Sequence, residues 1–215
     1  MNVLPWRYIV VEGVIGAGKT SLTKMLAGRL NAQVNLEVVE ENPFLAKFYQ
    51  DRSGYAFQTQ IFFLLSRYRQ QQVLHQPDLF GGAVVSDYLF AKDRVFANLN
   101  LEDDELALYD QLATVLEQRV LPPDLVIYLQ ASTDVLMDRI AMRGRSFERD
   151  MNRDYIDALS SAYSYFFHHY RGAPLLVVNT NTIDFVNVPR DFDLLFEQLK
   201  HEFQGTRYFA PASAG

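Results

Sequence analysis

The 215-residue sequence contains no cysteine, which excludes disulfide bonds and thiolate metal ligands. It also lacks any run close to about 18 consecutive apolar residues, so no membrane-spanning helix is expected. A signal peptide is not expected either, because the apolar stretch at residues 8–11 is short and leads directly into glycines. We therefore expect a cytoplasmic protein that does not associate with membranes.

Positive charge is scarce, since 20 Lys and Arg residues stand against 26 Asp and Glu residues and give a formal net charge of −6. Broad electrostatic binding to a nucleic-acid polymer is therefore not expected, although a local basic cluster could still bind a small polyanion. Hydrophobic residues make up 49% of the chain, which is sufficient for the packed core of one α/β domain. We expect this domain to cover residues 1–209, followed by a disordered tail at residues 210–215.

Apolar runs typical of buried strands alternate along the chain with segments of helical periodicity. This alternation predicts a five-stranded parallel sheet with helices on both faces, that is, a three-layer, doubly wound α/β fold. The expected strands cover residues 7–12, 34–39, 83–86, 124–130 and 175–179. The expected helices cover residues 20–30, 43–49, 56–74, 89–99, 102–120, 133–142, 150–171 and 191–203.

Residues 13–20, GVIGAGKT, match the phosphate-binding motif G-x-x-x-x-G-K-[ST] and lie between an expected strand and an expected helix. In such a loop, backbone N–H groups surround the phosphates and the helix N-terminus adds positive potential. The alternative is a glycine-rich turn followed by a surface lysine, but the strand-to-helix position favours a nucleoside triphosphate with Mg²⁺. The expected phosphate-binding residues are Gly13, Val14, Ile15, Gly16, Ala17 and Gly18, with Lys19 bridging the β- and γ-phosphates and Thr20 ligating the metal.

Asp87 directly follows the expected strand at residues 83–86. It resembles the acidic residue that ends a Walker B strand and helps to hold the metal ion or its waters. Ligands of open α/β sheets lie outside the carboxyl ends of the strands, which favours this function over simple capping of the next helix.

Three arginines, Arg139, Arg143 and Arg145, lie at the end of one expected helix and in the loop that Gly144 opens. Guanidinium groups gathered at one loop are costly unless an anion neutralises them, as in a lid that stabilises charge on a moving phosphoryl group. A solvated helix C-terminus, which favours cations, is the alternative. The absence of an N-K-x-D sequence argues against a switch GTPase.

Together with the sequence LEVVEENPF at residues 36–44, these motifs resemble the deoxynucleoside kinase family over nearly the whole chain. In that family a glutamate in an E-P-V sequence after the second strand is the general base for the 5′-hydroxyl group of the nucleoside, which attacks the γ-phosphate of ATP. The resemblance gives this role, and a possible metal contact, to Glu37, although Val38 stands where the family has proline. From the pattern alone, Glu40 or Glu41 would be preferred, because both precede a helix N-terminus.

The same resemblance implies further substrate contacts. Tyr49 and Glu148 are expected to hold the 3′-hydroxyl group of the sugar, and Gln60 is expected to bind the edge of the base. Arg67 and Asp93 match the charged pair of members that use dC, dA or dG, which disfavours thymidine. Asp87 is expected to contact the substrate in addition to the metal ion. The resemblance also implies a homodimer formed through long helices such as residues 102–120.

One departure concerns the acid-Arg-Ser motif that many members carry, because this chain reads Asp87-Tyr88-Leu89. Tyr88 cannot replace the charge of a guanidinium, and Arg94 or an arginine of the lid is the expected substitute. Two other classes stay open: a nucleoside monophosphate kinase, which shares the loop and the lid, and a nucleotide-binding regulatory protein. A carboxylate aimed at a neutral acceptor hydroxyl, Glu37, favours the deoxynucleoside kinase.

Overall fold

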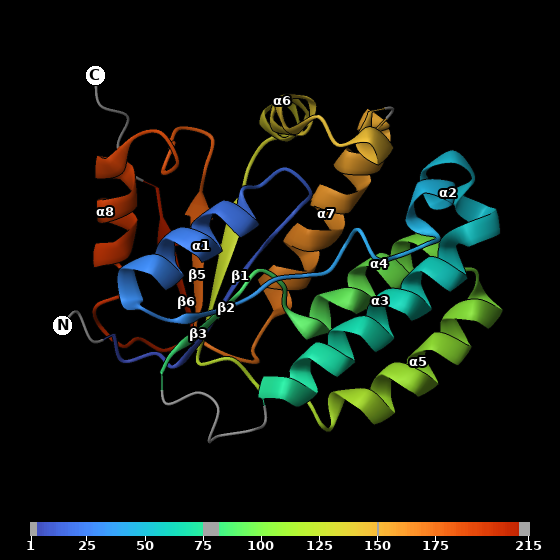
Figure 1. Ribbon diagram of the computed structural model, residues 1–215, viewed down its shortest axis with the longest axis horizontal. Helices are drawn as coiled ribbons and strands as arrows, with labels where there is room; N and C mark the ends of the chain where they lie inside the picture. The colour runs from blue at the N-terminus through green and yellow to red at the C-terminus, as the bar shows by residue number, and fades with distance from the viewer. Residues whose placement is uncertain (1–3, 75–81, 150, 211–215) are drawn as a thin grey trace.

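The computed structural model describes residues 4–74, 82–149 and 151–210. Within these residues, six parallel strands form one sheet in the order β2-β3-β1-β4-β5-β6 (Figure 1). From the central β1 the sheet extends through β3 and β2 on one side and through β4, β5 and β6 on the other. The strands are β1 (Tyr8–Gly13), β2 (Gln33–Asn35), β3 (Val84–Ser86), β4 (Leu125–Gln130), β5 (Leu175–Asn179) and β6 (Thr206–Phe209).

The prediction of five strands is wrong, because β6 pairs in parallel with β5 at the edge of the sheet. Its residues, Thr-Arg-Tyr-Phe, are all exposed or only partly buried. They therefore lack the buried apolar run that marks the central strands in the sequence.

β2 is also shorter than predicted, since it ends at Asn35 instead of reaching residue 39. The next backbone groups leave the sheet and bind side chains. The Nε2 group of Gln70 donates to the carbonyl oxygen of Leu36 at 2.6 Å, and the N–H group of Glu37 donates to Oδ1 of Asp87 at 2.7 Å. Because these side chains satisfy the backbone, no further ladder pairing is needed.

The helices follow the predicted segments with shifted ends. α2 begins at Leu45, because Oδ1 of Asn42 accepts the N–H group of Phe44 at 3.0 Å and keeps residues 42–44 in a turn. α8 ends at Glu197, before the predicted residue 203. The helices are α1 (Lys19–Leu30), α2 (Leu45–Gln50), α3 (Arg52–Leu74), α4 (Asp93–Asn100), α5 (Asp103–Glu117), α6 (Thr133–Arg143), α7 (Arg153–His169) and α8 (Pro189–Glu197), with the 3₁₀ turns η2 (Phe90–Lys92) and η3 (Ser146–Glu148).

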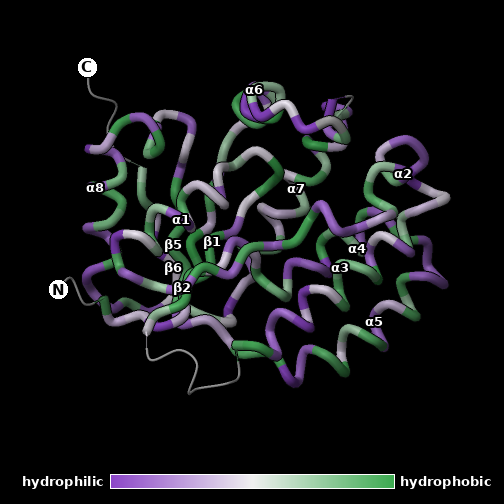
Figure 2. The backbone as a smooth tube through the Cα atoms, in the orientation of Figure 1, coloured by the Kyte–Doolittle hydropathy of each residue, from purple (hydrophilic) through white to green (hydrophobic). Residues whose placement is uncertain are grey.

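Helices cover both faces of the sheet, as the sequence predicts (Figure 1). α1 and α8 lie on one face, where the guanidinium of Arg29 contacts the rings of Phe192 and Phe196. α7 lies on the other face, where the ring of Phe167 stacks on Tyr128 of β4 with 4.1 Å between centroids. α4 packs beside α7, and α3 and α5 lie beyond it. The central strands are the most hydrophobic part of the trace, as Figure 2 shows.

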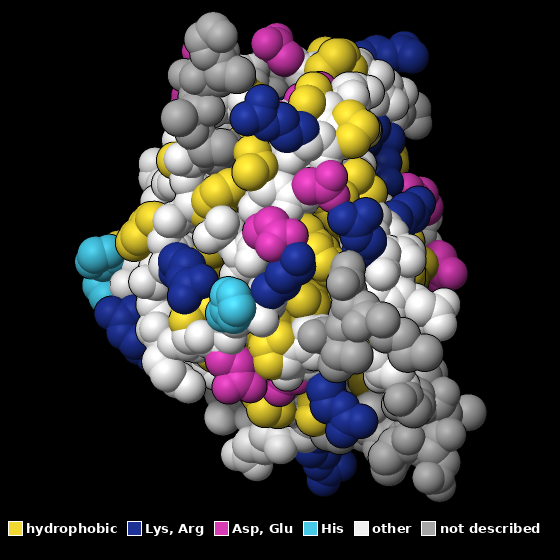
Figure 3. Space-filling view, turned by 90° about the vertical axis from the view of Figure 1, so that its left-hand side faces the viewer, with side chains coloured by type: hydrophobic (Ala, Val, Ile, Leu, Met, Phe, Trp, Pro, Cys, Tyr) yellow, Lys and Arg dark blue, Asp and Glu magenta, His cyan; other side chains and the backbone are white. Residues whose placement is uncertain are grey.

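The surface that carries α8 mixes basic and acidic side chains with apolar ones (Figure 3). Across residues 4–74, 82–149 and 151–210, no helix is both long enough and apolar enough to cross a membrane. Most of the predicted tail, residues 211–215, lies outside the described residues.

Candidate active site

A cavity of about 1100 Å³ opens where β1, β2, β3 and β5 end, since residues that follow each of these strands form its wall. This is the position at which open α/β sheets bind ligands, and the volume is that of a small-molecule site. Gly13, Val14 and Asp93 are not on the cavity wall. The predicted site residues on the wall are Ile15, Gly16, Ala17, Gly18, Lys19, Thr20, Glu37, Tyr49, Gln60, Arg67, Asp87, Arg139, Arg143, Arg145 and Glu148.

The glycine-rich loop at residues 13–20 curls around the ammonium group of Lys19. Nζ of Lys19 donates to the carbonyl oxygens of Gly13, at 2.8 Å, and Val14, at 3.3 Å. Gly16 and Gly18 have φ angles of 85° and 97°, and a Cβ atom on Gly16 would lie 2.7 Å from the carbonyl oxygen of Leu136. Only glycine fits this backbone without strain.

Asp87 joins this loop to the segment after β2. Its Oδ2 accepts the hydroxyl group of Thr20 at 2.6 Å, and its Oδ1 accepts the N–H group of Glu37 at 2.7 Å. η2, the next helical turn, has Leu89 at its N-cap and no side-chain cap, so Asp87 does not cap it. Thr20 and Asp87 place a hydroxyl and a carboxylate oxygen side by side, and Mg²⁺ prefers such oxygen ligands.

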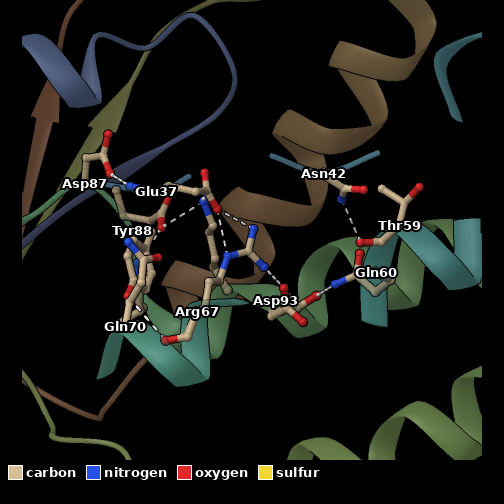
Figure 4. A network of polar contacts seen from close by, with 12 residues as sticks. Glu37, Asn42, Thr59, Gln60, Arg67, Gln70, Asp87, Tyr88 and Asp93 are labelled. Carbon is tan, nitrogen blue, oxygen red and sulfur yellow. Dashed lines mark hydrogen bonds and ion pairs between the residues drawn. The ribbon is translucent and has the colours of Figure 1, made fainter. Parts of the chain in front are cut away.

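Glu37 follows β2, and its side chain is 12% exposed on the cavity wall. Its Oε1 accepts the guanidinium of Arg67, with Nε at 2.7 Å, and its Oε2 lies 3.4 Å from Nζ of Lys92 (Figure 4). Burial alone raises the pKa of Glu37, but the positive charges of Arg67, Lys92 and Lys19 outweigh it and lower the pKa from 4.5 to about 2. Glu37 is therefore an anion at neutral pH.

Behind Glu37, Arg67 bridges to a second carboxylate. Its Nη1 forms an ion pair with Asp93, whose side chain is 1% exposed (Figure 4). Asp93 also accepts the hydroxyl group of Tyr109 at 2.7 Å, and Nε2 of Gln60 donates to its carbonyl oxygen at 3.0 Å. The predicted pair of Arg67 and Asp93 is therefore present, with Arg67 on the cavity wall and Asp93 behind it.

Tyr88 does not face the cavity. It is fully buried, and its hydroxyl group accepts Nδ2 of Asn35 at 3.2 Å. The expectation that Arg94 supplies the missing charge is wrong, because Arg94 pairs with Asp110 and Glu117 between α4 and α5. Beside Arg67, a second cation contacts Glu37: Nζ of Lys92, at 3.4 Å from Oε2. The sequence did not point to Lys92, because it stands between apolar residues and the start of a helix and has no recognisable motif.

The predicted arginines do not converge on one point. Arg143 and Arg145 both pair with Glu148, and Arg145 also pairs with Glu40 at 2.9 Å. Arg139 instead turns to the segment after β5, where Nη2 and Nη1 donate to the carbonyl oxygen and hydroxyl group of Thr180 at 2.8 and 3.1 Å. That segment also forms part of the cavity wall through residues 181–187. The sequence reading missed it, because it contains no charged motif.

Tyr49 lies beside Glu148, the other residue expected at the sugar. Its ring stacks on Phe147 with 6.1 Å between centroids. Burial, then the neighbouring Tyr155 and Glu148, raise the pKa of the Tyr49 hydroxyl far above its ordinary value, so this hydroxyl stays protonated and can donate a hydrogen bond. Glu148 is itself buried.

Comparisons with known proteins agree with one another. The family model described as deoxynucleoside kinase matches residues 9–203. The sequence is 34% identical over 205 residues to a deoxyguanosine kinase of Bacillus subtilis (strain 168), covering 93% of this chain and 98% of the relative. It is 35% identical over 208 residues to a deoxyadenosine kinase of Dictyostelium discoideum, covering 94% and 81%. The fold is also similar to a solved structure of deoxyadenosine kinase from M. mycoides with bound dATP, with a TM-score of 0.76 and 26% sequence identity. This match covers 90% of this chain and 100% of the solved chain.

Asp93 and Asp110 each pair with an arginine, but Asp93 is buried and Asp110 is exposed. The two aspartates should therefore contribute differently to stability. Asp93→Asn removes a charge that is 1% exposed, and we expect it to lower the free energy of unfolding by about 3–5 kcal/mol, because Arg67 loses a buried partner. Asp110→Asn, at a side chain that is 46% exposed, should cost about 1 kcal/mol or less. Urea denaturation at one protein concentration measures the free energy of unfolding of both variants. Equal losses would contradict the conclusion that the buried pair of Arg67 and Asp93 stabilises the fold more than the exposed pair of Arg94 and Asp110.

Proposed function

The chain belongs to the deoxynucleoside kinase family, and we propose that it transfers the γ-phosphoryl group of ATP to the 5′-hydroxyl group of deoxyadenosine, deoxyguanosine or deoxycytidine. The observation that carries this proposal is the ionised carboxylate of Glu37 on the wall of the cavity that also contains the loop at residues 13–20. A protein that only binds a nucleotide needs no such carboxylate. A monophosphate kinase needs cations that are free to bind the phosphate of the acceptor, whereas the cations beside Glu37, Arg67 and Lys92, are paired with carboxylates.

The loop at residues 13–20 is proposed to bind the phosphates of ATP through its backbone N–H groups and the N-terminus of α1. Lys19 would contact the β- and γ-phosphates. Burial, and then repulsion by Lys92, lower the pKa of Lys19 from 10.5 to about 8, and phosphate oxygens would stabilise its charged form. Thr20 and Asp87 would hold Mg²⁺, which when bound neutralises charge on the phosphates.

Glu37 is proposed to bind and orient the acceptor hydroxyl. The 5′-oxygen forms a bond to the γ-phosphorus, the bond from that phosphorus to the bridging oxygen breaks, ADP leaves, and the hydroxyl proton passes to Glu37. A carboxylate with a pKa of about 2 is a weak base. The proton therefore moves late, which suits the loose transition state of phosphoryl transfer, in which the attacking oxygen is only weakly bonded.

The sugar and the base are proposed to occupy the part of the cavity between α2, α3 and η3. Tyr49 and Glu148 would hold the 3′-hydroxyl group, and Gln60 and Arg67 would contact the base edge. Nε2 of Gln60 is held by the backbone of Asp93, which fixes the orientation of the amide. The ion pair of Arg67 with Asp93 supports a preference for dA, dG or dC over thymidine.

The arginine-rich segment at residues 139–148 is proposed to be the lid of the site. Arg143 and Arg145 are partly exposed and pair with Glu148, and Arg145 pairs also with the exposed Glu40. The Arg145–Glu40 pair, with side chains that are 32% and 63% exposed, is worth about 1 kcal/mol or less, so the phosphates of a bound nucleotide can compete with Glu40 for Arg145. Closure would exclude water and limit hydrolysis of ATP.

A homodimer is proposed through α3 and α5. These helices carry large apolar side chains that are exposed in the single chain: Leu65, Leu108, Leu112 and Val115. Leu108, Leu112 and Val115 recur at spacings of four and three, so they share one face of α5. Exposed apolar groups of this kind favour association between copies.

The general-base role predicts that Glu37→Gln lowers kcat by about 100-fold or more, because the acceptor hydroxyl loses its proton acceptor. The dissociation constant for ATP should change little. Steady-state kinetics and calorimetric titration with ATP measure the two quantities, and thermal denaturation confirms that the variant is folded. Glu41→Gln, at an exposed glutamate four positions along, is the matched control and should behave like wild type. Undiminished turnover by Glu37→Gln would overturn the role of this residue.

The acceptor class is tested by ATP consumption against dA, dG, dC, dT, their ribonucleoside counterparts and the monophosphates. We expect turnover of at least one of dA, dG and dC, little with dT, and loss of activity when EDTA removes Mg²⁺. Turnover with monophosphates alone would replace the proposal by a monophosphate kinase.

The proposed dimer predicts that Leu112→Glu on α5 shifts the protein towards the monomer, because it places a charge in an apolar interface. Sedimentation velocity at several concentrations measures the shift. Leu194→Glu on α8, at a leucine of similar exposure, should leave the oligomeric state unchanged. A wild-type protein that is monomeric at micromolar concentration would contradict the dimer.

A further inference from the structure

Lys92 is a buried lysine on the wall of the cavity, with a side chain that is 2% exposed. It is the last residue of η2, directly before α4. Its Nζ lies 3.4 Å from Oε2 of Glu37 and 3.6 Å from Oε2 of Glu12. Burying an ammonium group is costly unless it is paired, so this lysine is held in place by two carboxylates of which one, Glu37, faces the acceptor side of the cavity.

Glu12 is the second carboxylate that pairs with Lys92. It is fully buried in β1 and is not part of the cavity wall. Its Oε1 accepts the N–H group of Gly13 at 2.9 Å and the hydroxyl group of Tyr163 at 3.3 Å, and its Oε2 accepts the N–H group of Leu89 at 2.8 Å. These donors meet the hydrogen-bonding needs of Glu12 but carry no charge, so Lys92 is its charge partner at 3.6 Å. Because Glu12 already has these hydrogen bonds, it does not require the N–H donors of Lys92.

Arg67, Arg143 and Arg145, three other cations on the cavity wall, are more fully engaged by carboxylates than Lys92 is. Arg67 is engaged by Glu37 and Asp93 through Nε and both Nη atoms, and Arg143 and Arg145 pair with Glu148. By contrast, the hydrogen bond that the described residues give Lys92 is the one to Glu37. An ammonium group has three N–H donors, so Lys92 can add a bond to an oxygen atom placed beside Glu37.

Lys92 is also close to the phosphate side of the site. Burial is the largest cause that lowers the pKa of Lys19, and the positive charge of Lys92 is the second. The same charge helps to lower the pKa of Glu37. It therefore acts on the phosphate-binding lysine and on the acceptor carboxylate together. Lys19, Glu37 and Lys92 line the same cavity, and on the proposed function the transferred phosphoryl group passes from the side of Lys19 to the acceptor oxygen at Glu37.

On the proposed function given above, we propose that Lys92 is a catalytic residue that donates a hydrogen bond to the 5′-oxygen as it attacks the γ-phosphorus, with Glu12 as the residue that positions it. The hydroxyl proton passes to Glu37 and ADP leaves, so the step takes no proton from Lys92. Its fixed charge stabilises negative charge that is shared between the attacking oxygen and the phosphoryl group. Such stabilisation is large in a site that excludes water.

The test compares Lys92→Met, Lys92→Arg and the double variant Glu12→Gln/Lys92→Met. Methionine keeps an unbranched stem in the buried space and removes the charge, and arginine keeps the charge. The double variant removes both members of the pair, so that no unpaired buried acid is left. The readouts are kcat and KM for the best deoxynucleoside, the dissociation constant for ATP, and thermal denaturation. Lys200→Met, at an exposed lysine that pairs with Glu197, is the matched control and should match wild type.

We expect Lys92→Met to lower kcat by about 100-fold or more, the loss typical of removing one preorganised donor to a developing oxyanion. KM for the deoxynucleoside and the dissociation constant for ATP should change by less than about fivefold, and Lys92→Arg should recover at least about tenfold in kcat. The double variant should recover thermal stability without recovering kcat. A kcat within about threefold of wild type in either methionine variant would overturn the assignment, because a purely structural pair would then explain Lys92.

Glu37→Gln, measured in the same assays, separates this inference from the proposed function. A slow Glu37→Gln with a fast Lys92→Met overturns only the role of Lys92. Wild-type turnover by Glu37→Gln, or no deoxynucleoside phosphorylated by the wild-type protein, overturns the proposed function itself.

Discussion

The ion pairs of Arg67 hold together the part of the cavity wall that carries Glu37. This one side chain on α3 binds Glu37 through Nε and Nη2 and Asp93 through Nη1, and Asp93 is held in turn by the hydroxyl group of Tyr109 on α5. A guanidinium is a planar, rigid fork that suits such simultaneous contacts. The carboxylate of Glu37 is thereby oriented by helices that lie far from it in the sequence, although its own backbone has already left the sheet.

The same contacts form part of a chain of alternating charges. Glu12, Lys92, Glu37, Arg67 and Asp93 follow one another as anion, cation, anion, cation and anion. They come from β1, η2, the segment after β2, α3 and α4. Each member pairs with the next, which offsets the cost of removing it from water, and the loss of one member leaves its neighbours unpaired. The site therefore depends on the relative positions of all five segments.

This arrangement also sets the protonation states of the site. Burial favours a neutral Glu37, yet the three nearby cations hold its pKa at about 2. Since this folded-state pKa is depressed below the ordinary value of 4.5, the stability that Glu37 contributes is present above that value and is lost as the pH falls through about 2. At neutral pH the cavity wall thus carries the negative charge of Glu37, flanked by the positive charges of Arg67 and Lys92.

The alternation of strands and helices and the loop at residues 13–20 follow from the sequence, because each depends on a local pattern or a short motif, whereas the candidate role of Glu37 came from the family resemblance and not from the pattern. The sequence also located the charged and glycine-rich part of the cavity wall, but not the segment at residues 181–187. It did not determine β6, whose residues lack a buried apolar run, or the early end of β2, where side chains of Gln70 and Asp87 bind the backbone. Nor did it find Lys92 or the contact of Arg139 with Thr180. These features arise only in the folded chain, because each depends on groups that are distant in the sequence: β6 on its pairing with β5, and the others on side chains that meet near the carboxyl ends of the strands.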